Sequence, residues 1–246
     1  MNERIRTFMR LELLFSQYGY FKNDDAQWSM RSAINTLLDI NDLVSRTDLK
    51  TELIKELERH LSTLKALQKN PGVDPDRLNM VLDDINAYLE NLRDTNFQPG
   101  MALKRDELVN SIKQRNTILG GTCNFDLPAY HHWLNRPADI RYETLSKWEN
   151  DLQTIKKSIS LSLHLIRSST NPASECAIKG FYQKALEANV SCQLIRIIVP
   201  NDLLFYPEIS AGKHRFTIRF MDQNMTTNRP VQTDQDVKFE LHCCIL

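Results

Sequence analysis

The stretch Lys213-His214-Arg215-Phe216-Thr217-Ile218-Arg219-Phe220-Met221 determines how the C-terminal part of this 246-residue chain folds. Apolar and polar residues alternate with a period of two, which is typical of a β-strand with one buried face. The side chains that we expect to face a core are those of His214, Phe216, Ile218 and Phe220. Lys213, Arg215 and Arg219 then share the opposite face, where a strand rise of about 3.3 Å per residue spreads them over roughly 20 Å. No acidic residue lies within the stretch to neutralise them.

Other short strands are predicted around this one. Residues 190–199 are apolar on both faces, which predicts a central strand, whereas Pro207 makes 203–209 an edge strand because proline donates no hydrogen bond. Residues 180–183 and 236–244 also have strand patterns, the latter with Val237, Phe239, Leu241 and Cys243 inward. Short strands in sequence, joined by turns, favour an antiparallel sheet or sandwich.

Up to about residue 169 the apolar spacing is helical instead, with steps of three and four. Asp74 followed by Pro75 is a good start for one helix, because Asp caps and Pro fits the first turn. The predicted helices are 3–17, 28–43, 47–69, 75–92, 104–117, a short one up to Trp133, and a long one at 139–168. The fold class is therefore α+β, a multi-helix bundle domain at 1–172 packed with a smaller antiparallel β-sheet or sandwich domain at 173–246. We allow for a contribution of 118–127 to the β domain.

Composition narrows the class of protein. Hydrophobic residues make up 41% and charged residues 25%, with 31 cations against 31 anions. Such a neutral chain has no bulk attraction to nucleic acid, so electrostatic recognition must come from local clustering. No apolar run reaches the ~20 residues that span a bilayer, and the charged N-terminus lacks a signal-peptide core. We expect a cytoplasmic protein without membrane insertion, whose five cysteines are free thiols.

Catalytic and metal sites are weakly indicated. The chain has no Cys-x-x-Cys or His-x-x-x-His spacing, so we expect no metal and no cofactor. Gly120-Gly121-Thr122-Cys123 precedes a thiol but lacks the residues of a nucleophile elbow or a phosphate-binding loop. An enzyme that uses Cys123 with His131 or His132 is the alternative hypothesis, and a structural cysteine is the simpler interpretation.

The basic strand face has three interpretations. It can be an ordinary solvated face, since exposed ion pairs contribute only about 0–1 kcal/mol. It can bind an acidic partner, because arginine recognises carboxylates in a bidentate manner. A nucleic-acid binder would need aromatic residues on the same face for stacking, whereas Phe216 and Phe220 are predicted on the opposite face.

The order of several motifs resembles a known family. They are 2–12 (NERIRTFMRLE), 51–57 (TELIKEL), 71–74 (PGVD), 120–128 (GGTCNFDLP), 206–210 (YPEIS), 215–221 (RFTIRFM) and 239–241 (FEL). Together they closely resemble the ZapD family of bacterial cell-division proteins over nearly the whole chain. The resemblance implies a homodimer that is not an enzyme, acts in the cytoplasm at the mid-cell division ring, binds the acidic C-terminal tail of FtsZ and bundles FtsZ filaments.

The resemblance also implies which residues bind the tail. By residue match they are Arg215 and Arg219 in Arg-Phe-Thr-Ile-Arg-Phe, and Arg46 before Thr-Glu-Leu, with Lys50 as the alternative to Arg46. Lys213 lies on the same predicted strand face and completes the set of expected partner-binding residues.

Overall fold

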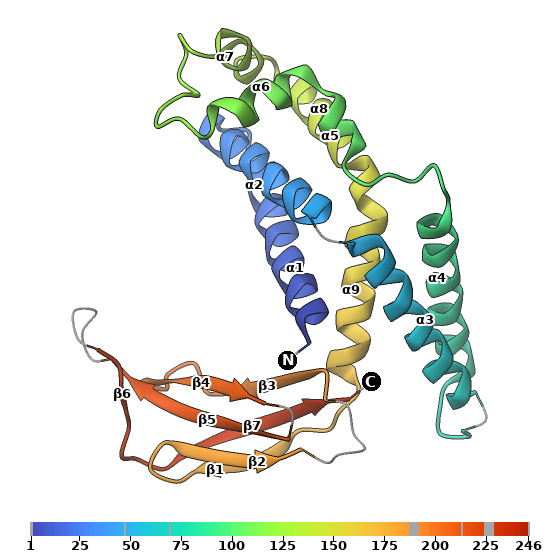
Figure 1. Ribbon diagram of the computed structural model, residues 1–246, viewed down its shortest axis with the longest axis vertical. Helices are drawn as coiled ribbons and strands as arrows, with labels where there is room; N and C mark the ends of the chain where they lie inside the picture. The colour runs from blue at the N-terminus through green and yellow to red at the C-terminus, as the bar shows by residue number, and fades with distance from the viewer. Residues whose placement is uncertain are drawn as a thin grey trace. The chain divides into compact units, whose positions relative to one another are not determined.

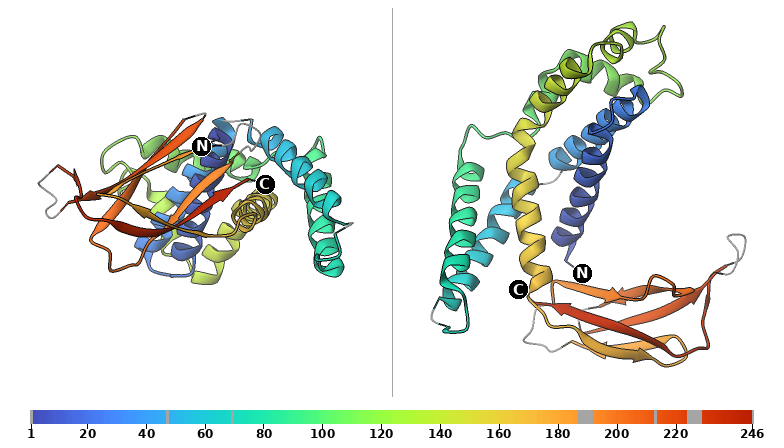
Figure 2. Two further views of the ribbon diagram at one scale, coloured as in Figure 1. Left: turned by 90° about the horizontal axis from the view of Figure 1, so that it is seen from below. Right: turned by 180° about the vertical axis from the view of Figure 1, so that it is seen from behind.

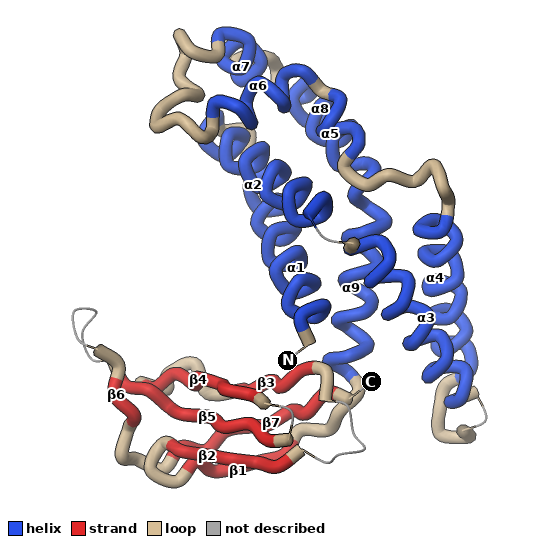
Figure 3. The backbone as a smooth tube through the Cα atoms, viewed as in Figure 1, coloured by secondary structure: helices blue, strands red, loops and turns tan. Residues whose placement is uncertain are grey.

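A computed structural model describes residues 2–46, 48–68, 70–186, 192–212, 214–223 and 229–245 (Figure 1). The chain divides into two compact units. One comprises Thr7–Ser162, and the other comprises Met1–Arg6 with Leu163–Leu246. Helices form the first unit, and the strands all follow the last helix (Figure 3). This is an α+β fold, as predicted.

Helices occupy most of residues 3–168, and two of them begin at a capping aspartate, Asp74 or Asp106. Their bounds are α1 Glu3–Lys22, α2 Gln27–Arg46, α3 Leu49–Leu67, α4 Pro75–Arg93, α5 Met101–Arg105, α6 Glu107–Arg115, α7 Pro128–Leu134, α8 Ala138–Glu149 and α9 Gln153–Ser168. The predicted start of α4 is confirmed, because the Asp74 carboxylate accepts hydrogen bonds from the N–H groups of Asp76 and Arg77 (3.0 and 3.2 Å). Helices α1 and α2 run antiparallel, as do α3 and α4 (Figure 1).

Two predicted helices are each divided in the structure. The single helix expected at 104–117 is α5 and α6, because Asp106 ends α5 and its carboxylate caps α6 at Val109 N–H (3.0 Å). The long helix expected at 139–168 is α8 and α9, separated by the 3₁₀ turn Asn150–Leu152. In that turn the Asp151 carboxylate accepts a hydrogen bond from Ala102 N–H (2.9 Å). Periodicity continues across both breaks, so apolar spacing alone does not reveal them.

The segment 118–127 lies in the helical unit and forms turns, without a strand contribution. Arg31 on α2 holds it, since its Nη1 donates to the carbonyl of Thr122 (3.0 Å) and its guanidinium lies 4.7 Å from the centre of the Tyr130 ring. The allowance for a β contribution from this segment was therefore wrong.

The strands make two antiparallel sheets. Their bounds are β1 Ala173–Ala177, β2 Phe181–Ala185, β3 Leu194–Ile198, β4 Phe205–Ala211, β5 Arg215–Asp222, β6 Val231–Gln232 and β7 Val237–Cys244. One sheet has the order β1-β7-β3 and the other β2-β5-β4, with β6 paired to β5. The edge position predicted for 203–209 is confirmed in β4. The central position predicted for 190–199 is wrong, because β3 lies at a sheet edge and β7 is central; residues 190 and 191 lie outside the described residues.

The two sheets face each other as layers, which are also visible from behind (Figure 2). Aromatic side chains join the layers across the core. Phe239 of β7 lies 5.2 Å from Tyr182 of β2 and 5.4 Å from Phe220 of β5, measured between ring centres. The fully or largely buried core comprises Ala177, Phe216, Ile218, Phe220, Val237, Phe239 and Leu241. Cys243 packs against it, as predicted. Phe216, Ile218 and Phe220 anchor β5 in this core through one face of the strand.

Candidate partner-binding site

The basic strand is β5, the central strand of its sheet, and its alternation is confirmed. Phe216, Ile218 and Phe220 are fully buried, whereas Arg215 and Arg219 are exposed on the outer face. Burying three large side chains contributes about 1.5–3 kcal/mol each, so the strand is held firmly in this orientation. His214 is an exception, because it precedes the strand and is exposed instead of facing the core. The arginines therefore project from a rigid element.

The neighbouring strand places a carboxylate beside one of the arginines. Glu208 of β4 is the register partner of Arg219, so both side chains point to the outer face. Neither arginine forms an ion pair with any residue that the structure describes, and Glu208 is exposed. The stretch itself lacks an acid, as the sequence shows, but the sheet supplies one from a distant segment. The guanidinium groups stay available to an external carboxylate.

Aromatic residues also lie on the outer face. Phe181 of β2 is the register partner of Arg219, and Tyr206 of β4 is the register partner of Met221. Phe181 is 39% exposed and Tyr206 is 38% exposed. Phe216 and Phe220 are buried as predicted, but Phe181 and Tyr206 bring aromatic rings to the outer face from other strands, so stacking residues are present there. Tyr206 is two residues from Glu208, so strand alternation could have put both on one face.

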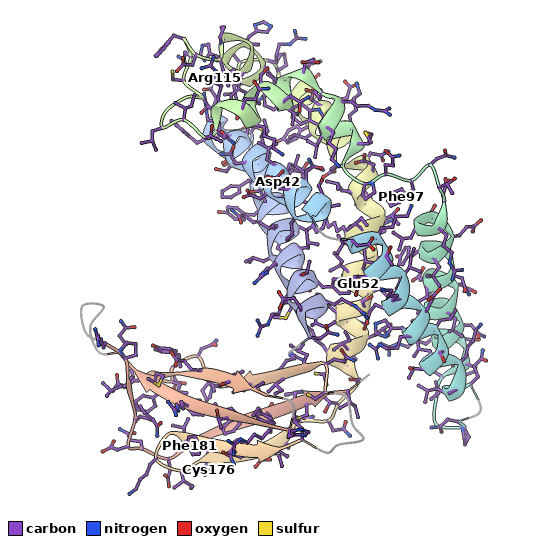
Figure 4. All side chains as sticks on the ribbon, viewed as in Figure 1. Asp42, Glu52, Phe97, Arg115, Cys176 and Phe181 are labelled. Atoms are coloured by element: carbon purple, nitrogen blue, oxygen red, sulfur yellow. The ribbon has the colours of Figure 1, made fainter. Side chains whose placement is uncertain are left out.

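The remaining predicted site residues are not brought to this face by any described contact. The Lys50 ammonium donates to the carbonyls of Asp94 and Phe97 (2.9 and 3.1 Å) within the helical unit, where Figure 4 marks Phe97. Arg46 is the last residue of α2, and its side chain lies outside the described part of the structure. Lys213 also lies outside the described residues. Lys50 thus has a structural partner already.

The alternative catalytic pair is not assembled by any contact between described residues. The Cys123 thiol donates to the carboxylate of Asp126 (3.2 Å). The thiol is therefore paired with a carboxylate three residues away and not with either histidine of the hypothesis. His131 instead contacts Asn135, whose side-chain amide donates to the His131 carbonyl (2.8 Å).

Neither a metal-binding cluster nor a membrane-spanning helix occurs in the described part of the chain. There, no three His, Cys, Asp or Glu side chains come together in a way that could hold a metal ion. In the same part of the chain, no helix combines the length and apolar character needed to cross a bilayer.

Fold and surface together define a class: a helical unit joined to a β-sandwich that presents arginines on an outer sheet face. A family model described as "ZapD: Cell division protein" matches residues 9–219. Proteins named Cell division protein ZapD align from Methylococcus capsulatus (40% identity over the whole chain and 96% of the relative), Cupriavidus taiwanensis (39%, 99% and 96%) and Nitrosomonas eutropha (38%, 100% and 97%). The chain belongs to the ZapD cell division protein family, and its role is in cell division.

Proposed function

We propose that this protein is a non-enzymatic cross-linker of FtsZ filaments, which acts as a homodimer in the cytoplasm at the mid-cell division ring. Membership of the ZapD family supports a role in cell division. The main support for the proposed binding site is that Arg215 and Arg219 are exposed on a strand whose opposite face is fully buried. Two arginines whose backbone positions lie about 13 Å apart along the strand suit an extended acidic peptide, such as the C-terminal tail of FtsZ.

Bundling follows from avidity in this proposal. Two or three charge-assisted contacts, less the cost of ordering a flexible tail, correspond to micromolar affinity, or about −8 kcal/mol. A dimer presents two faces and a polymer displays many tails, so bivalent binding raises the effective affinity by ~10²–10⁴. Bundling should weaken as salt rises, because exposed charges are screened beyond ~8–10 Å.

The other predicted residues have a smaller place in the proposal. Lys213 lies outside the described residues and stays a prediction from strand alternation, and Arg46 stays a prediction from the family resemblance. Lys50 would have to exchange its bonds to the Asp94 and Phe97 carbonyls for bonds to the tail. We therefore rank Lys50 below Arg215 and Arg219.

The experiment is the double variant Arg215→Glu with Arg219→Glu, tested by sedimentation of FtsZ polymers and by binding of a labelled FtsZ tail peptide. We expect loss of the bundled fraction and tail binding weakened by at least about 100-fold, since hydrogen bonds to charged groups contribute about 1.5–3 kcal/mol each. The matched control is Lys157→Glu with Lys238→Glu, which changes the charge equally at exposed residues on α9 and β7. Full bundling by a folded arginine variant would refute the proposed site.

A further inference from the structure

The outer face of the β2-β5-β4 sheet has an apolar end next to Arg219. Phe181, Tyr206 and Met221 form this apolar end, and they come from β2, β4 and β5. Figure 4 marks Phe181 on the β domain. Large apolar side chains that stay partly exposed around one cation provide both apolar and charged contact to a ligand. An acid-binding site alone does not need them.

Hydrogen bonding across the strands shows how close Phe181 lies to Arg219. The N–H of Phe220 donates to the carbonyl of Gly180 (2.8 Å) and the N–H of Leu186 donates to the carbonyl of His214 (2.8 Å), so hydrogen-bonded positions recur at every second residue from Gly180. The adjacent pair, Phe181 and Arg219, is therefore of the non-hydrogen-bonded kind, whose side chains lie closer together. Its Cβ atoms should be about 4.5–5.5 Å apart. A ligand residue bound beside the Arg219 guanidinium would therefore also contact the Phe181 ring.

The turn before β2 fixes this ring. Lys179 and Gly180 have positive φ angles of 50° and 68°, and the N–H of Phe181 donates to the carbonyl of Ile178 (3.0 Å). Positive φ at both central positions is the geometry of a tight type I′ turn. A Cβ on Gly180 would lie 2.7 Å from the carbonyl oxygen of Thr233, so only glycine fits. Phe181 is thus the first residue of a strand whose start is rigid.

We propose that this face recognises a peptide with a large apolar side chain directly beside a carboxylate, and that Phe181 and Tyr206 determine this specificity. The inference rests on the proposed function and deepens it. The apolar side chain packs on the apolar end while the adjacent carboxylate binds Arg219. A second carboxylate, about 13 Å along the peptide, binds Arg215.

The middle of the face leaves room for such a chain. Between the two arginines, the outer positions of β5 and its neighbours are Thr217, Gln183 and Ser210. These side chains are small or flexible and uncharged. These three positions supply no cation between the arginines, so a chain with a phosphate at every residue step would leave its central phosphates unpaired. The chemistry therefore favours a peptide with spaced acids over a nucleic acid.

The test uses two synthetic peptides of equal length and equal negative charge, one with phenylalanine beside an acid and one with serine in its place. Fluorescence anisotropy measures the dissociation constant of each for the wild-type protein. We expect the phenylalanine peptide to bind about tenfold more tightly, which corresponds to roughly 55 Å² of additional apolar surface buried. This preference should persist at high salt, while binding of both peptides weakens.

Variants separate the apolar end from the arginines. Phe181→Thr with Tyr206→Thr should abolish the preference, so that the two peptides bind with equal dissociation constants. The control is Ile198→Thr, which removes an exposed apolar side chain (42% exposed) from β3 in the other sheet. The wild-type comparison of peptides stands by itself if the double variant does not fold.

Each other outcome has a distinct meaning. Equal affinity of the wild-type protein for both peptides would overturn the inference and leave the arginine site intact. Failure of both peptides to bind would overturn the proposed function itself. Tighter binding of a single-stranded oligothymidylate than of either peptide would replace the peptide with a nucleic acid and overturn the inference.

Discussion

His60 should make the helical unit lose stability as the pH falls, and replacing it should remove that loss. The His60 side chain on α3 is fully buried, and its Nε2 lies 3.4 Å from Oε1 of Glu56. Burial lowers the pKa of His60 from 6.5 to about 4. The Glu56 carboxylate raises this pKa and the Arg59 guanidinium lowers it, each less strongly than burial acts. The imidazole is therefore neutral in the folded protein at neutral pH.

The direction of the pH effect follows from proton binding. With a folded pKa of about 4 and an unfolded pKa of about 6.5, the unfolded chain binds more protons between these values. The free energy of unfolding is therefore fully retained above pH 6.5 and falls as the pH drops toward 4. One pKa unit corresponds to about 1.4 kcal/mol, so lowering the pH from 8 to 5 should cost about 2 kcal/mol at this residue.

The variant His60→Leu keeps a side chain of similar size and cannot be protonated. Urea unfolding, followed by circular dichroism at 222 nm, should give a wild-type loss between pH 8 and pH 5 that exceeds the loss in His60→Leu by about 2 kcal/mol. Other titrating groups cancel in this difference. His164→Leu, which replaces an exposed histidine on α9, is the matched control and should follow the wild type. Identical pH profiles for the wild type and His60→Leu would refute the reasoning.

Two further substitutions test local features of the helical unit. Asp74→Ala should destabilise the helical unit by about 1 kcal/mol, because the N–H groups of Asp76 and Arg77 lose their cap. Asp74→Ser should restore most of this stability, since serine also caps helices. Thermal unfolding measures the stability of both variants. Gly100→Ala should destabilise the helical unit by more than about 1 kcal/mol, since Gly100 has φ +76° and an added Cβ would lie 2.0 Å from Oδ1 of Asn41. An unchanged denaturation midpoint for Gly100→Ala would mean that Asn41 moves aside without cost.

The orientation of β5 could be predicted from the sequence because it depends on a local rule. Side chains alternate between the faces of a strand, so the apolar set that includes Phe216 and Ile218 must take the buried face and the arginines the exposed one. The start of α4 is local in the same way, since Asp74 caps N–H groups within three residues of itself. Family membership could also be read from motifs distributed along nearly the whole chain.

What surrounds Arg219 was decided only by the tertiary structure. Strand pairing sets Phe181, 38 residues earlier, on one side of Arg219 and Glu208, 11 residues earlier, on the other. No local pattern contains that register, because it depends on which strands become neighbours and where their pairing begins. The edge position of β3 and the full burial of His60 have the same origin. Local alternation is thus enough to assign the arginines to the outer face of β5, whereas long-range strand pairing places Phe181 and Glu208 beside Arg219.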